Sequence, residues 1–209
     1  MNSVMNRMKA AIARFRSDER ASLSIEFVIM FPLLAWVYLG MFVYFDGFRA
    51  QSQSDKASFT IADMVSRETN YITPNYIDTL YSLHGMMTRD HNPTKLRISI
   101  LEWDDINEYY TRVWSEHRGG VEDLTNDIIR TENYRNRLPD GLPHGEELIL
   151  VEAWTLYEPP FDLGRLISWN WSGDFGAVRF DTFVVVRPRF TSQVCWNPVE
   201  NGDASTSVC

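Results

Sequence analysis

A single carboxylate stands at the start of a long apolar segment: Glu26 is followed by 19 uncharged residues, Phe27 to Phe45. A carboxylate inside hydrocarbon costs several kcal/mol unless it is paired, protonated or held at the interface. A cut after Ala21 would create an α-amine on Ser22, one helical turn from Glu26, able to pair with that acid in the same chain or a neighbouring one. Such an acid would fix the register of packed helices, because a misplaced neighbour would leave it unpaired. The simpler alternative places Glu26 among the lipid headgroups, where it needs no function.

The element that carries this acid is predicted to be a helix that crosses a membrane. Residues 27–45 would span about 28 Å at roughly 1.5 Å per residue, close to the ~30 Å hydrocarbon thickness of a bilayer. Five basic residues lie in the first 20 positions, whereas the chain from Asp46 onward holds 25 acidic and 15 basic residues. This charge distribution predicts a cytoplasmic N-terminus and a body outside the cytoplasm. A removed signal peptide is the alternative, but its apolar stretch is usually ~7–15 residues long and ends in an A-x-A-like site, which residues 44–56 lack.

Composition and motif spacing predict neither catalysis nor a cofactor. The net charge of −8 argues against nucleic-acid binding, which needs basic patches. The four histidines have unrelated spacings, so we expect surface residues and no metal site: His84, His91, His117 and His144. Residues 203–207 match the D-x-S-x-S metal-adhesion pattern, but only two residues follow, so the match is interpreted as accidental.

The aromatic residues are predicted to serve two purposes, packing in the sheet and contact with a partner. Trp103, Trp114 and Trp154 are predicted to be core or edge residues of a sheet. A glycine-containing loop at residues 168–176 is a candidate contact surface, through three aromatic residues: Trp169, Trp171 and Phe175.

The two cysteines, Cys195 and Cys209, both lie in the last 15 residues. In an oxidising compartment a bridge between them is favoured over two free thiols, because the intervening residues are rich in turn formers. Closing a loop of this length would stabilise the fold by up to ~3 kcal/mol.

Hydrophobic periodicity predicts an α+β fold: a long N-terminal helix, with a transmembrane half and an amphipathic half, and then a small antiparallel sheet with helices on one face. The amphipathic half continues to about residue 67 and is expected to pack through one face, with Ile61 and Met64 beside it: Phe48, Phe59, Ala62 and Val65. A second helix is expected to begin at Pro74. Further segments are predicted as strands at 95–104, 108–117, 146–158 and 180–190, and as a helix at 121–138.

Residues 20–32, RASLSIEFVIMFP, resemble the signal of type IV pilins after a short basic leader. That signal has a small residue at the cut, four uncharged residues, a glutamate and then an apolar helix. The closer similarity is to the TadE-like pseudopilins of the tight-adherence (Flp pilus) system, in which an E-F-[AV] triplet, here residues 26–28, precedes a proline, here Pro32. The segment 182–190, TFVVVRPRF, is also similar to the strand that ends proteins of this family.

The resemblance implies that a prepilin peptidase cuts between Ala21 and Ser22. Ala21 stands where family members usually carry glycine, although alanine is also small enough for a tight subsite. The implied organisation is a leader at residues 1–21, a transmembrane assembly helix at 22–45 and an extracytoplasmic α+β domain at 46–209.

The resemblance further implies that Glu26, Phe27 and Pro32 serve recognition or assembly. The implied partners are the inner membrane, the prepilin peptidase, other pilins or pseudopilins and the pilus assembly machinery. The expected function is that of a minor pilin or pseudopilin in pilus biogenesis, surface attachment and biofilm formation, with the domain in the periplasm or incorporated in the pilus at the cell surface. The alternative is an uncleaved, membrane-tethered periplasmic binding or sensor module.

Overall fold

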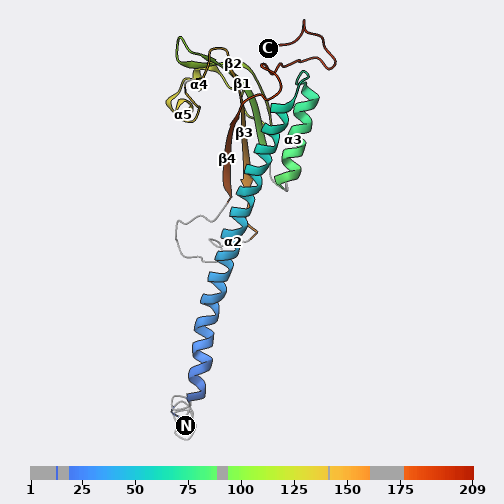
Figure 1. The fold of residues 1–209 in the computed structure, drawn as a ribbon. Coiled ribbons are helices and arrows are strands. Elements are labelled where there is room, and N and C mark those ends of the chain that lie inside the picture. Colours follow the sequence, from blue (N-terminus) through green and yellow to red (C-terminus); the bar gives the residue numbers. More distant parts are fainter. Residues whose placement is uncertain (1–12, 14–18, 89–93, 141, 161–176) are drawn as a thin grey trace.

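A rod-like helix joins a compact head at one end in the computed structural model, which describes residues 13, 19–88, 94–140, 142–160 and 177–209 (Figure 1). The rod is α2 (Glu19–Arg67), whose 49 residues extend about 73 Å at ~1.5 Å per residue. The helix continues through Pro32, which lacks an N–H group and so leaves one carbonyl without its usual partner. The predicted long N-terminal helix is confirmed.

The head is built on a four-stranded antiparallel sheet in the order β2-β1-β3-β4. Its strands are β1 (Thr94–Asp104), β2 (Tyr109–Arg118), β3 (Glu147–Tyr157) and β4 (Val178–Val186). The helix α3 (Pro74–Thr88) begins at the proline that was expected to start it. The predicted α+β class is therefore correct.

The sheet is covered on both faces. α2 and α3 pack on one face, where alternate residues of β1 are buried as predicted, namely Leu96, Ile98 and Ile100. The opposite face is closed by the segment between β2 and β3, through Leu124 and Ile129. The pairing of β1 with β2 skips Val113, and this irregularity lets Trp114 join the first cluster while Tyr110 joins the second.

The tryptophans that were expected in the sheet lie there. Trp103 and Trp114 are 6% and 4% exposed, and Trp154 is half-buried. Trp114 also packs against Trp196, and its indole N–H donates to the carbonyl of Val194 at 2.6 Å. These side chains therefore fix the C-terminal segment as well as the core.

The single helix predicted over 121–138 is wrong. The chain forms two one-turn helices there, α4 (Asn126–Ile129) and α5 (Glu132–Arg135). They are separated at Thr131, whose backbone is extended (φ −65°, ψ 147°) and whose hydroxyl donates to the carbonyl of Ile128 at 2.6 Å. A β-branched residue that bonds back to the preceding turn competes with helix continuation.

The packed face of α2 also differs from the predicted one. Phe48 and Phe59 are 53% and 60% exposed, so they do not belong to it. The buried residues include several small ones that let the helix backbone approach the sheet closely: Ser54, Ala57, Ser58, Ile61, Ala62 and Val65. One histidine departs from expectation too, because His84 on α3 is fully buried rather than on the surface.

Candidate functional site

The predicted processing and assembly residues lie on the free part of α2. Residues 21 and 22 belong to the helix, and the side chain of Glu26 is exposed. Phe27 is 65% exposed and stacks on Phe31 at a centroid distance of 5.4 Å. The structure therefore places this signal on an extended helix, away from the head.

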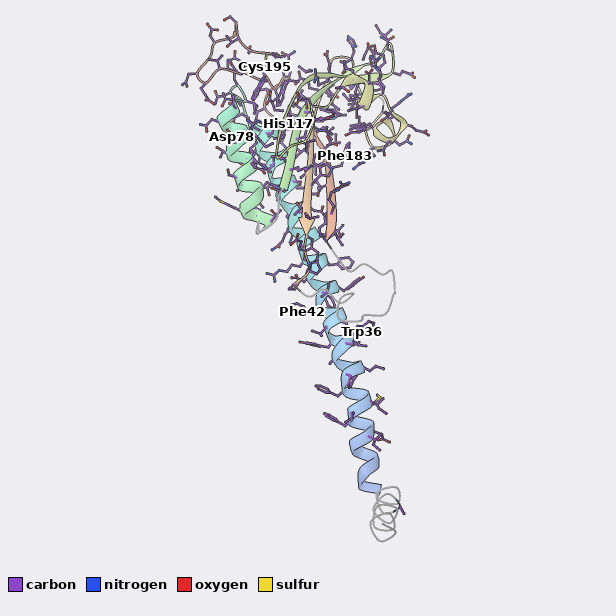
Figure 2. All side chains as sticks on the ribbon, turned by 180° about the vertical axis from the view of Figure 1, so that it is seen from behind. Trp36, Phe42, Asp78, His117, Phe183 and Cys195 are labelled. Carbon is purple, nitrogen blue, oxygen red and sulfur yellow. A yellow bond between two sulfur atoms is a disulfide. The ribbon has the colours of Figure 1, made fainter. Side chains whose placement is uncertain are left out.

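We call residues 25–48 of α2 the stalk half. Its large apolar residues are between 39% and 71% exposed, with the exceptions of Leu39 and Val43. Figure 2 shows these side chains, Trp36 and Phe42 among them, projecting from the helix below the sheet. Of the helices in the described part of the chain, α2 is the one long and apolar enough to cross a membrane.

We call residues 51–67 the head half, because this part of α2 packs on the sheet. The Ser54 hydroxyl lies 3.1 Å from that of Thr155 on β3 and 3.4 Å from that of Thr182 on β4. Thr182 also donates to Asp55 at 3.2 Å. Such paired hydroxyls satisfy polar atoms that the close packing buries.

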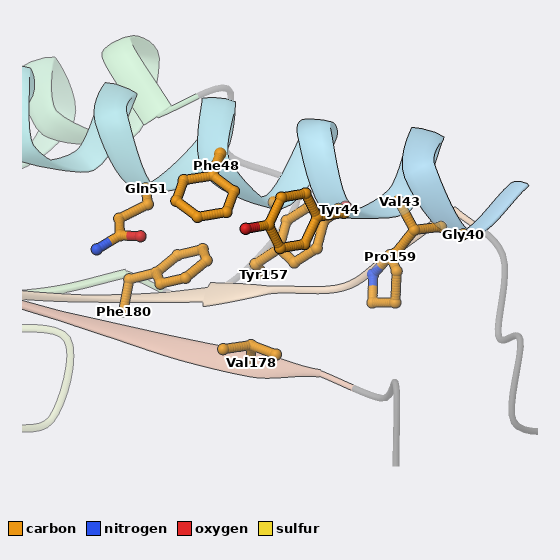
Figure 3. Close-up of a pocket in the computed structure, with 10 residues that line it drawn as sticks. Gly40, Val43, Tyr44, Phe48, Gln51, Tyr157, Pro159, Val178 and Phe180 are labelled. Carbon is orange, nitrogen blue, oxygen red and sulfur yellow. The ribbon is translucent and has the colours of Figure 1, made fainter. Parts of the chain in front are cut away.

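A hollow of about 240 Å³ lies where the two halves meet and where β3 ends and β4 begins, and we call it the neck pocket (Figure 3). The sheet side contributes four residues: Tyr157, Pro159, Val178 and Phe180. The helix side contributes six: Gly40, Val43, Tyr44, Gly47, Phe48 and Gln51. Its lining is thus mostly aromatic and aliphatic.

One of the lining residues makes a polar contact that joins the sheet to the helix. The Tyr157 hydroxyl donates to Asp46 Oδ2 at 2.9 Å, linking the end of β3 to α2. Burial and this carboxylate raise the pKa of Tyr157 to about 12, so the phenol stays protonated at physiological pH. Sequence reasoning missed the pocket, although the two glycines seven positions apart in an apolar helix were a signal for it.

A disulfide joins Cys195 to Cys209, as predicted. The segment it closes is attached to the head by the carbonyl of Cys195, which accepts from the Ile72 N–H at 2.9 Å, and by the N–H of Asn197, which donates to the Ile72 carbonyl at 2.8 Å. The nearby N–H of Val194 donates to Glu147 Oε2 at 2.8 Å. Burial raises the pKa of Glu147, and this hydrogen bond partly opposes the shift.

A buried ion pair crosses the other face of the sheet. Arg97 Nε donates to Glu152 Oε2 at 2.8 Å, and Tyr134 bridges the pair by accepting from Arg97 and donating to Glu152, both at 2.7 Å. Burial, together with the Glu152 carboxylate, raises the pKa of Tyr134 to about 12. Every partner is satisfied within the head, so we interpret this network as structural.

Among the residues that the structure describes, one group of side chains could offer ligands to a cation. Donor atoms of Asp104, Asp105 and His144 lie within 4.8 Å of one another at the β1–β2 turn. However, Asp104 already accepts bonds from the N–H groups of Ile106 and Asn107 and from the Asn107 amide, which lowers its pKa. Asp104 therefore stabilises the β1–β2 turn, and Asp105 pairs with His144 at 2.7 Å.

The residues that match the D-x-S-x-S pattern also form a turn. Asp203 Oδ1 accepts bonds from the backbone N–H and the hydroxyl of Ser205, and these bonds lower the pKa of Asp203. The candidate contact loop, with Trp169, Trp171 and Phe175, lies outside the described residues.

Comparisons with protein-family models, with characterised proteins and with solved structures found no match.

Proposed function

We propose that the chain is a pilin-like subunit held in the bacterial inner membrane by the stalk half, with its head in the periplasm. The observation that carries the proposal is the division of α2. Large side chains of the stalk half are exposed, whereas Ile61, Ala62 and Val65 of the head half are 0% exposed. An apolar surface of this extent requires lipid or neighbouring helices to cover it.

Within this class, the function is that of a TadE-like minor pilin or pseudopilin in a tight-adherence system, acting in pilus biogenesis and surface attachment. The support is the pattern of basic leader, small residue, Glu26 and apolar helix. A prepilin peptidase would release the leader between Ala21 and Ser22. Stalk halves would then bundle while Glu26 of one chain pairs with the Ser22 ammonium of the next. The pairing is favourable because both charges would otherwise stand alone in hydrocarbon.

The test is Glu26→Gln in cells that produce the fibre, with Glu19→Gln as the matched control. Both changes remove one carboxylate, but Glu19 belongs to the leader. Glu26→Gln should insert normally and lower the yield of sheared fibres at least roughly tenfold, the factor for ~1.4 kcal/mol per subunit contact. Glu19→Gln should behave like the wild type. Normal fibre yield with Glu26→Gln would contradict the assembly role.

A second function, an uncleaved membrane-tethered binding or sensor module, is favoured by one observation, the neck pocket. A binding module needs a concave, mostly apolar site, and the pocket has that character. The two functions differ in the mature N-terminus, which is Ser22 for the pilin and Met1 for the tether.

A further inference from the structure

The neck pocket lies at the level where the apolar run ends. Its lower residues, Gly40 and Val43, belong to the uncharged run, and the first charges beyond that run are Asp46 and Arg49. Gln51, its uppermost helix residue, is exposed. If the stalk half crosses a bilayer, the pocket therefore spans the boundary between hydrocarbon and water on the side of the head.

Two glycines create the space. A Cβ atom at Gly40 would meet no atom within 4 Å, and one at Gly47 would meet only the Tyr157 ring, at 3.7 Å. Glycine inside a helix is destabilising relative to alanine. No helix side chain fills the hollow at these two positions, so the space is open to an occupant.

The lining suits a hydrocarbon chain. None of the ten lining residues is charged, and the Tyr157 hydroxyl is already bonded to Asp46. Tyr157 and Phe180 form one aromatic wall, with ring centroids 6.0 Å apart, and Tyr44 and Phe48 form another, 4.6 Å apart (Figure 3). The volume of about 240 Å³ exceeds that of the ~150 Å³ apolar cavity that binds benzene in another protein.

We propose that the neck pocket binds one acyl chain of a phospholipid from the leaflet nearest the head. The inference rests on the membrane anchorage in the proposed function, and is independent of pilus assembly. Lipid surrounds each copy before any neighbour arrives, and a chain end can enter the pocket without leaving the hydrocarbon. Because the lining is uncharged, binding should be indifferent to the headgroup.

The experiment uses the full chain in phosphatidylethanolamine and phosphatidylglycerol vesicles that contain phospholipid with a diazirine in one acyl chain. After illumination, mass spectrometry maps the adducts. The expected adducts include Phe180, a half-buried sheet residue that lines the pocket, whereas adducts on Val178, which is 45% exposed, would not by themselves show entry into the pocket. Swapping the labelled headgroup should leave these adducts unchanged.

Variants test whether the glycine space is required. Gly40→Leu should fill the pocket and lower the adducts at Phe180 at least roughly fourfold, the factor for losing one buried methylene contact. Ala35→Leu, at a different azimuth on the same helix, adds similar bulk and should leave them unchanged. Formation of the disulfide and tryptophan fluorescence verify that the head is folded. Equal loss in both variants would overturn the role of the pocket.

The outcomes separate this proposal from the proposed function. Adducts on residues 27–34 without any at Phe180 would overturn the pocket proposal alone, and no adducts anywhere on α2 would overturn the anchorage as well. A benzophenone side chain placed at Phe180 identifies the occupant directly. A lipid adduct supports the proposal, whereas a crosslink to a second copy or within the chain overturns it.

Discussion

The two halves of α2 differ in composition and in surroundings: the stalk half is almost uniformly apolar, whereas the head half is amphipathic and packs on the sheet. Ile29 in the stalk half is 64% exposed, whereas Ile61 in the head half is 0% exposed. The head half faces the sheet with small residues such as Ser54 and Ala57, whose buried positions allow close contact. The stalk half instead carries large side chains around most of its circumference. Within one continuous helix, small buried residues beside polar exposed ones therefore mark the part that packs on its own chain, and large apolar residues on all sides mark the part that does not.

The same substitution should change the free energy of unfolding by very different amounts in the two halves. Ile61→Ala should lower the free energy of unfolding of the head by about 2–5 kcal/mol, because it opens a cavity in the core. Ile29→Ala should leave that free energy nearly unchanged. The measurement is denaturant unfolding of the full chain in detergent, followed by tryptophan fluorescence. Similar midpoints for the two variants would show that the head half is not part of the core.

The disulfide lies in the head, so its removal should affect the stability of the head and leave the stalk half unchanged. Cys195→Ser and Cys209→Ser should each lower the free energy of unfolding by up to ~3 kcal/mol, since either change opens the same loop. Membrane insertion should not change. Reductant should reproduce the effect in the wild type. A wild-type chain whose unfolding midpoint is insensitive to reductant would argue against the bridge.

The smallest expected effect is a pH dependence that arises in the head. Burial raises the pKa of Glu147, so the folded state binds a proton more tightly than the unfolded state does. The stability from this group is therefore fully present below its ordinary pKa of 4.5 and is lost as the pH rises through the higher folded value. Relative to Glu147→Gln, the wild type should lose stability over that interval. A parallel pH profile for the two proteins would contradict this account.

The positions of helices and strands can be predicted from this sequence more accurately than the contacts between them. Alternation in β1 and the proline at the start of α3 were read correctly, because local patterns encode them. The break at Thr131 was missed, since it depends on one hydroxyl bonding back to the preceding turn. The packed face of α2 differs from the predicted one because small residues such as Ser54 and Ala57 form it, whereas the large aromatic residues Phe48 and Phe59 are exposed.

The features of the candidate site also differ in how far the sequence predicts them. The signal around Glu26 stays a prediction, and the bridge between the cysteines could be predicted from residue types and order. The neck pocket could not, because it forms where α2 meets residues such as Tyr157 and Phe180, more than 100 positions away in the chain. The Arg97–Glu152 pair was hidden for the same reason, since strand register brings its partners together.

The N-terminal residue of the mature chain is the most direct test of the proposal that a prepilin peptidase cuts between Ala21 and Ser22. The proposed pilin should begin at Ser22 and weigh about 2.4 kDa less than the 24.3 kDa precursor, since the leader is 21 of 209 residues. Intact mass spectrometry of the chain from fibre-producing cells should find that form, and replacing Ala21 by a bulky residue should prevent it. A chain that begins at Met1 in cells with functional fibres would contradict the account.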